Sequence, residues 1–97
     1  MAYRQGPALS SYNLEALTAG AAIKAGTGVL HLLTINTKGA SSNVVTLYDG
    51  VDTTGTKIAT IDTTVNPGSF LYDVQFTAGL YITSVTGTAA KITVSYS

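Results

Sequence analysis

The chain contains no cysteine and no tryptophan, and few of its residues are charged. Without cysteine, neither a disulfide framework nor a thiolate metal site is possible. Small secreted domains usually need such cross-links, so their absence favours a protein assembled in a reducing cytoplasm or stabilised by its own oligomer. Charged residues make up 10% of the 97 residues, whereas an average soluble domain has roughly 25%. This deficit predicts that something other than water covers part of the surface.

The few charges balance one another. Five basic and five acidic residues give a formal net charge of zero. No basic cluster is present that would attract nucleic acid or a membrane surface. No hydrophobic run approaches the roughly 18 residues of a transmembrane helix. We therefore expect neither a nucleic-acid partner nor a membrane partner, and the weakly charged surface predicts self-association.

What the chain does have is a regular alternation of short apolar runs and glycine-containing turns. The turns lie at or beside Gly26, Gly39, Gly50, Gly55, Gly68, Gly79 and Gly87. Turns at such short intervals, separated by runs rich in Val, Ile, Leu, Thr and Tyr, are typical of antiparallel strands and leave no room for a helix. The sequence predicts an all-β fold, a single small antiparallel β-sandwich of about eight strands over residues 13–97. Strand count does not separate a jelly roll from an immunoglobulin-like sandwich.

Two segments carry the strongest strand signals. The longest apolar run covers residues 28–37, and simple alternation would place His31 on the same face as Leu33 and Ile35. The clearest alternation covers residues 70–76, where the side chains at even positions are predicted to point inward. The run at residues 28–37 begins apolar on both faces, which indicates a central strand or a strand that meets a partner subunit.

Residues 1–12 are predicted to form a flexible N-terminal arm. The Gly6-Pro7 step opposes regular strand pairing, and Tyr3 and Tyr12 are the large amphipathic side chains of the segment. We expect both tyrosines to bind a partner chain. The alternative interpretation is a frayed terminus.

No combination of residues predicts catalysis, a metal or a cofactor. His31 is the single histidine, and no nucleophile or carboxylate adjoins it in sequence, so a structural role is favoured over that of a general base. Asp49, Asp52 and Asp62 could in principle bind Ca²⁺, but their spacing matches no calcium motif and favours turns. We predict that the protein is not an enzyme and has no catalytic, cofactor-binding or metal-binding residues.

The six tyrosines admit two interpretations. Tyrosine is favoured in cores and at subunit interfaces, where the ring is buried and the hydroxyl reaches a polar neighbour. Exposed tyrosine rings can also stack on sugars. The second interpretation predicts a carbohydrate-binding or adhesion module.

Several strand-and-turn segments resemble small capsid decoration, or cement, proteins of tailed bacteriophages. The segments are 28–31, 36–40, 45–50, 55–58, 73–76, 79–81 and 91–96, with the sequences GVLH, NTKGA, VTLYDG, GTKI, DVQF, GLY and KITVSY. They lie within residues 26–97, and residues 1–25 carry no part of the resemblance. Similar segments could also occur in phage tail or fibre proteins, so the alternative that the resemblance implies is a carbohydrate-binding or adhesion module of a phage tail or fibre.

The resemblance implies a non-enzymatic sandwich on the outer surface of the phage head. Its implied partner is the major capsid protein, and its implied assembly is a homotrimer. The expected location is the virion, with assembly in the host cytoplasm. The resemblance transfers no site residue, because the matching segments are strands and turns.

Overall fold

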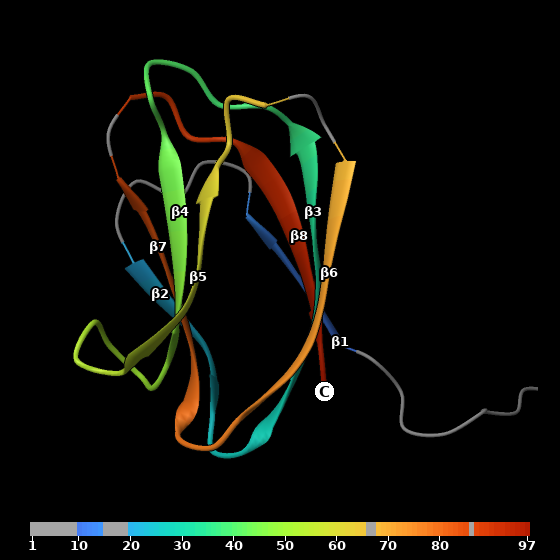
Figure 1. Ribbon diagram of the computed structural model, residues 1–97, viewed down its shortest axis with the longest axis vertical. Helices are drawn as coiled ribbons and strands as arrows, with labels where there is room; N and C mark the ends of the chain where they lie inside the picture. The colour runs from blue at the N-terminus through green and yellow to red at the C-terminus, as the bar shows by residue number, and fades with distance from the viewer. Residues whose placement is uncertain (1–9, 15–19, 66–67, 86) are drawn as a thin grey trace, which may run out of the picture.

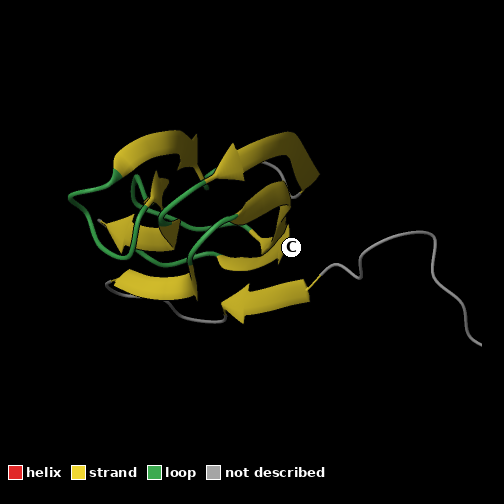
Figure 2. Ribbon diagram, turned by 90° about the horizontal axis from the view of Figure 1, so that it is seen from below, coloured by secondary structure: helices red, strands yellow, loops and turns green. Residues whose placement is uncertain are grey.

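The computed structural model describes residues 10–14, 20–65, 68–85 and 87–97. In chain order the strands are β1 (Ser10–Leu14), β2 (Gly20–Ala25), β3 (Gly28–Thr37), β4 (Val44–Asp49), β5 (Thr56–Asp62), β6 (Gly68–Phe76), β7 (Gly79–Val85) and β8 (Lys91–Tyr96). Figure 2 shows only strands and loops in this part of the chain, and no helix there could cross a membrane. The predicted all-β sandwich is confirmed.

The eight strands form two antiparallel four-stranded sheets that face each other (Figure 1). The orders are β1-β8-β3-β6 and β2-β7-β4-β5. First therefore pairs with last, second with seventh, third with sixth and fourth with fifth. This pairing is that of a jelly roll, whereas an immunoglobulin-like sandwich would place its first two strands side by side in one sheet. The strand order thus decides between the two topologies that the sequence left open.

The core lies between the sheets. Its fully enclosed aliphatic side chains come mainly from the inner strands β3, β4, β7 and β8, because these have neighbours on both sides in their sheets. The hydrophobic residues with 0% exposure are Leu30, Leu33, Leu47, Phe76, Leu80, Ile82 and Val94. Burial of this kind contributes about 25 cal/mol for each Å² of apolar surface removed from water.

A buried polar cluster closes the sandwich where β4 begins and β5 ends. Asn43 is 1% exposed. Its Nδ2 donates to Ser84 Oγ over 2.9 Å, and its Oδ1 accepts from Thr63 Oγ1 over 2.6 Å. These bonds satisfy three buried polar side chains together, which removes the free-energy cost of leaving any of them unpaired.

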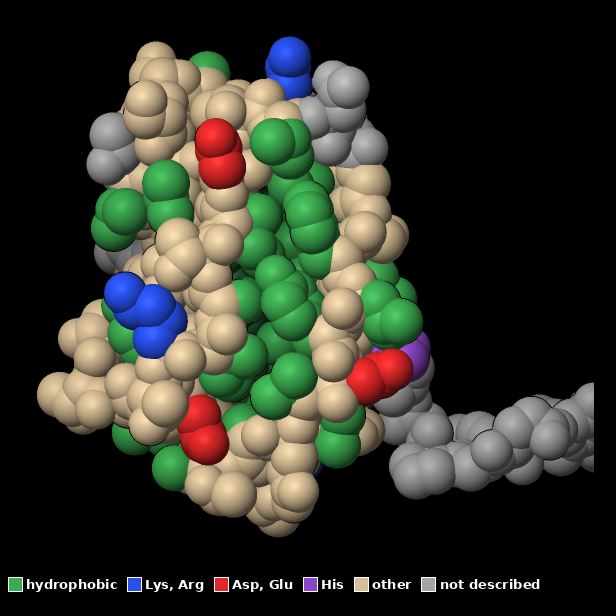
Figure 3. Space-filling view, viewed as in Figure 1, with side chains coloured by type: hydrophobic (Ala, Val, Ile, Leu, Met, Phe, Trp, Pro, Cys, Tyr) green, Lys and Arg blue, Asp and Glu red, His purple; other side chains and the backbone are tan. Residues whose placement is uncertain are grey.

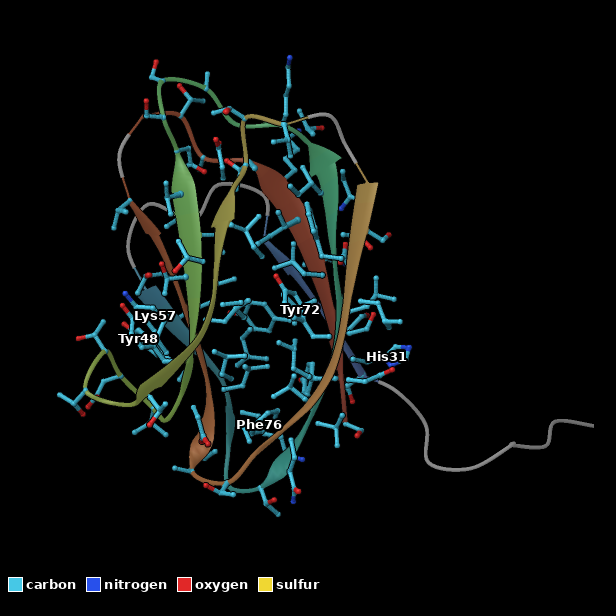
Figure 4. All side chains as sticks on the ribbon, viewed as in Figure 1. His31, Tyr48, Lys57, Tyr72 and Phe76 are labelled. Carbon is cyan, nitrogen blue, oxygen red and sulfur yellow. The ribbon has the colours of Figure 1, made fainter. Side chains whose placement is uncertain are left out.

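A break in alternation on β3 corrects the sequence prediction for His31. The register of β3 shifts between Leu30 and Leu32 against both β6 and β8. Leu30 and Leu33 are therefore both buried, and His31 between them is half-buried, on the outer side of the sheet (Figure 4). His31 does not share the inner face with Leu33, because from Leu30 to Leu32 β3 has one residue more than the paired part of β8. Against β6 the extra residue lies on β6 instead.

The boundary between arm and sandwich also differs from the prediction. Residues 10–12 belong to β1 rather than to a free arm, since Ser10 pairs with Tyr96 and Tyr12 pairs with Val94. The ring of Tyr12 packs against the hydrophobic core. Tyr12 is therefore partly buried within its own chain, contrary to the expectation that it needs a second chain. Tyr3 lies outside the described residues.

Candidate functional site

The most distinctive surface feature is an apolar groove between β5 and β6. Each of these strands is the last in its sheet and pairs with a single neighbour. The two sheets therefore end opposite each other without a strand to close the gap. The groove has a volume of about 570 Å³ and is lined by Thr60, Ile61, Asp62, Val65, Phe70 and Tyr72. Figure 3 shows a band of hydrophobic side chains along this gap.

The groove exists because inward-facing side chains of edge strands are covered from one side only. Ile61 of β5 is almost fully buried, at 4% exposure. Phe70 and Tyr72 of β6 pack against the same core but remain partly exposed, and Figure 4 shows Tyr72 lying between the sheets. Val65, in the connection from β5 to β6, is 42% exposed. The groove is thus a continuation of the core that is open to solvent.

One carboxylate marks the polar part of the groove. Among the described residues that line it, Asp62 is the charged one. Its Oδ1 accepts hydrogen bonds from the Thr64 hydroxyl at 2.6 Å and the Thr64 N–H at 2.9 Å. These bonds lower the pKa of Asp62 below its usual value, and burial raises the pKa of the Tyr72 phenol. The groove suits an apolar group that is neutral or that carries a positive charge nearby.

A second surface feature is a tyrosine pair on the outer face of the sheet β2-β7-β4-β5. Tyr48 of β4 lies opposite Tyr81 of β7, next to the buried pair Leu47 and Ile82. Alternation therefore turns the two tyrosines outward, and Lys57 of β5 pairs with Tyr48. The rings are 6.4 Å apart and tilted by 56°. Figure 4 shows Tyr48 and Lys57 together on this outer face.

The structure gives His31 a carboxylate partner that sequence proximity did not reveal. Its Nδ1 lies 2.5 Å from Oδ1 of Asp73. Both side chains are solvent-accessible, at 34% and 55% exposure, and Asp73 has a positive φ of 50° at the bulge of β6. Within the described residues, no serine or threonine hydroxyl is hydrogen-bonded to His31. The pair therefore lacks the nucleophile of a hydrolytic triad in this part of the chain.

The aspartates considered for calcium act separately as caps of turns. Asp49 accepts from the backbone N–H groups of Thr77 and Ala78 at 2.8 to 3.1 Å. The Ala78 N–H makes the largest contribution to lowering the pKa of Asp49, followed by the Thr77 N–H. Asp52 likewise accepts from the hydroxyl and the N–H of Thr54, which lowers its pKa. In the part of the chain that the structure describes, no group of three or more acidic, histidine or cysteine residues is placed to hold a metal.

Comparison with protein-family models found no match for this chain, and comparison with curated proteins found none either.

Proposed function

We propose that the protein is a capsid decoration protein that binds the outer surface of a tailed-phage head as a homotrimer. The observation that carries the proposal is the apolar groove, because it leaves core residues open to water on one side of an otherwise closed sandwich. The groove offers a partner partly exposed hydrophobic side chains to cover, and a chain with so little charge opposes association only weakly. The segments that resemble decoration proteins indicate which kind of partner to expect, the major capsid protein.

The mechanism needs no chemical step. A protein that binds the assembled shell more tightly than the ruptured shell stabilises the assembled one by the difference in binding free energy. Each copy that bridges neighbouring capsid subunits would contribute a modest binding free energy. Summed over many identical copies, these contributions would make the shell resistant to internal pressure. The fold suits this role, because a sandwich of short antiparallel strands presents fixed, rigid faces.

The direct test is to return purified protein to particles that lack it. Particles from a strain with the gene deleted should bind the protein at saturable sites and then withstand higher temperature before releasing DNA. Two variants at valines of similar exposure, 42% for Val65 and 52% for Val51, serve as test and control. Val65→Asp places a charge in the groove and should weaken binding to the particles. Val51→Asp places a charge in the loop after β4 and should leave binding unchanged. Failure of the unmodified protein to bind would reject the proposed function.

The outward tyrosine pair favours a second candidate, a glycan-binding module. Aromatic rings at a sheet surface can stack on sugar rings, and Lys57 could donate hydrogen bonds to hydroxyl groups. The Tyr48→Ala and Tyr81→Ala variants should abolish glycan binding under this candidate. Under the decoration proposal, a broad glycan screen should show no saturable binding to the unmodified protein.

A further inference from the structure

We propose that the groove between β5 and β6 binds residues 1–9 of a second copy of the chain. The groove needs an occupant that is apolar, extended and free of negative charge. The segment 1–9, MAYRQGPAL, contains Tyr3 and Leu9 as apolar side chains and Arg4 as its charged side chain. Its Gly6 precedes a proline, and such residues favour extended backbone.

Shape and charge favour this occupant. The groove is walled by Ile61, Phe70 and Tyr72, so an aromatic ring entering it would find aromatic and aliphatic partners. Tyr3 is followed directly by Arg4, and Asp62 is the charged residue of the lining. With Tyr3 in the groove, we expect the Arg4 guanidinium to lie near the rim of the groove, where Asp62 is exposed. No acidic side chain of the segment would oppose that approach.

The direction of the chain favours exchange between copies over folding back. β1 and β6 are the opposite edges of one sheet, with β8 and β3 between them, which separates them by about 14 Å. Register places Ser10 level with Val74, and Phe70 lies about 13 Å farther along β6. Tyr72, also in the wall, lies nearer than Phe70, so the straight line from Ser10 to the groove is about 16 to 19 Å, and it runs through the sheet. Residues 3–10 span at most about 24 Å, and a route over the outer face must also pass around β6, so folding back would need nearly the whole length of the segment.

Because the chain contains no cysteine, any disulfide cross-link in a double-cysteine variant must join the introduced thiols. In an Ala2→Cys/Val65→Cys double variant, Tyr3 is retained and one new thiol lies beside the groove. Oxidation with oxidised glutathione should give covalent dimers or larger species on a non-reducing gel. The matched Ala2→Cys/Val51→Cys variant should stay monomeric, because Val51 lies in the loop after β4 with similar exposure. An intrachain disulfide, unreacted thiols, or equal cross-linking in both variants would each overturn the proposal.

A second measurement separates binding from folding. Deletion of residues 1–9 and the Val65→Asp substitution should each weaken self-association by at least about tenfold in sedimentation experiments, as expected for loss of a buried aromatic anchor. Combining them should weaken it no further, because both remove the same contact. Val51→Asp should have no effect on self-association. At concentrations where the unmodified protein is also dissociated, all variants should melt near the unmodified protein, because association itself raises the melting temperature. A monomeric full-length chain at micromolar concentration, or additive effects, would contradict the proposal. The test uses no particle. A monomeric chain would therefore contradict this inference and the homotrimer, whereas binding to the phage head is decided separately by the particle experiment.

Discussion

The centre of the sandwich and the groove between β5 and β6 are built from the same kinds of residue but differ in how they are covered. Leu33 and Leu47, on inner strands, are 0% exposed. Phe70 and Tyr72, on an edge strand, contact the same core and remain partly open to water. The difference comes from topology and not from hydrophobicity. It teaches that substitutions in the centre should affect folding, whereas substitutions in the groove should affect association.

Truncation in the centre should give the largest loss of stability. Leu47 is 0% exposed. Leu47→Ala removes buried methyl groups and leaves a cavity, so the free energy of unfolding should fall by about 2–5 kcal/mol. Val65→Ala, in the groove, should cost less than about 1 kcal/mol because the side chain is partly solvated already. Urea denaturation followed by circular dichroism measures both. Equal losses at the two positions would remove the distinction between centre and groove.

Substitutions in the buried polar cluster should cause the second-largest loss of stability. Asn43→Ala removes the side-chain bonds to Ser84 and Thr63, although the Thr63 hydroxyl keeps its bond to the Asn43 carbonyl. A buried group left unpaired costs about 1–3 kcal/mol. Ser84→Ala removes a single partner and should cost less. Thermal melting of the two variants gives the order, and a smaller effect for Asn43→Ala than for Ser84→Ala would show that the cluster is solvated.

The aspartates that cap turns predict a dependence on acid. The pKa values of Asp49, Asp52 and Asp62 are lowered in the fold from the ordinary 3.8. Groups with lowered pKa stabilise the folded state above the unfolded pKa, and this stabilisation is lost as the pH falls through the folded pKa. The melting temperature should therefore be insensitive to these groups from neutral pH down to about pH 4, and should fall below that. Asp49→Asn should show a shallower fall, and an unchanged profile would reject its role.

The smallest effect is expected at the exposed pair on the outer face. His31 and Asp73 are both solvent-accessible, and exposed ion pairs contribute about 0–1 kcal/mol. His31→Gln should leave melting temperature, self-association and particle binding nearly unchanged. A large loss of particle binding without loss of stability would place this outer face at the interface with the particle.

Local signals in the sequence were sufficient for the strands and turns. The glycine turns and the alternation along residues 70–76 predicted β6 and its neighbours, because both features depend on the local backbone. The bulge at His31 was not predictable, since an extra residue is defined only against a partner strand. Tyr12 was assigned to an arm because its pairing with Val94 joins opposite ends of the chain.

The groove could not be predicted from the sequence, because it too depends on which strands are neighbours. Its lining comes from strands whose side chains look like ordinary core residues, as in the predicted inward face containing Phe70 and Tyr72. Their exposure depends on β5 and β6 being the last strands of opposite sheets. Only the strand order contains that information.

The most direct test of the proposed function is the copy number of the protein in purified virions, measured by quantitative mass spectrometry against the major capsid protein. A decoration protein should be present at a copy number comparable with that of the major capsid protein, with unmodified and Val51→Asp proteins equally abundant. A few copies per particle would indicate a tail or fibre component instead. Complete absence from the particle would contradict the account.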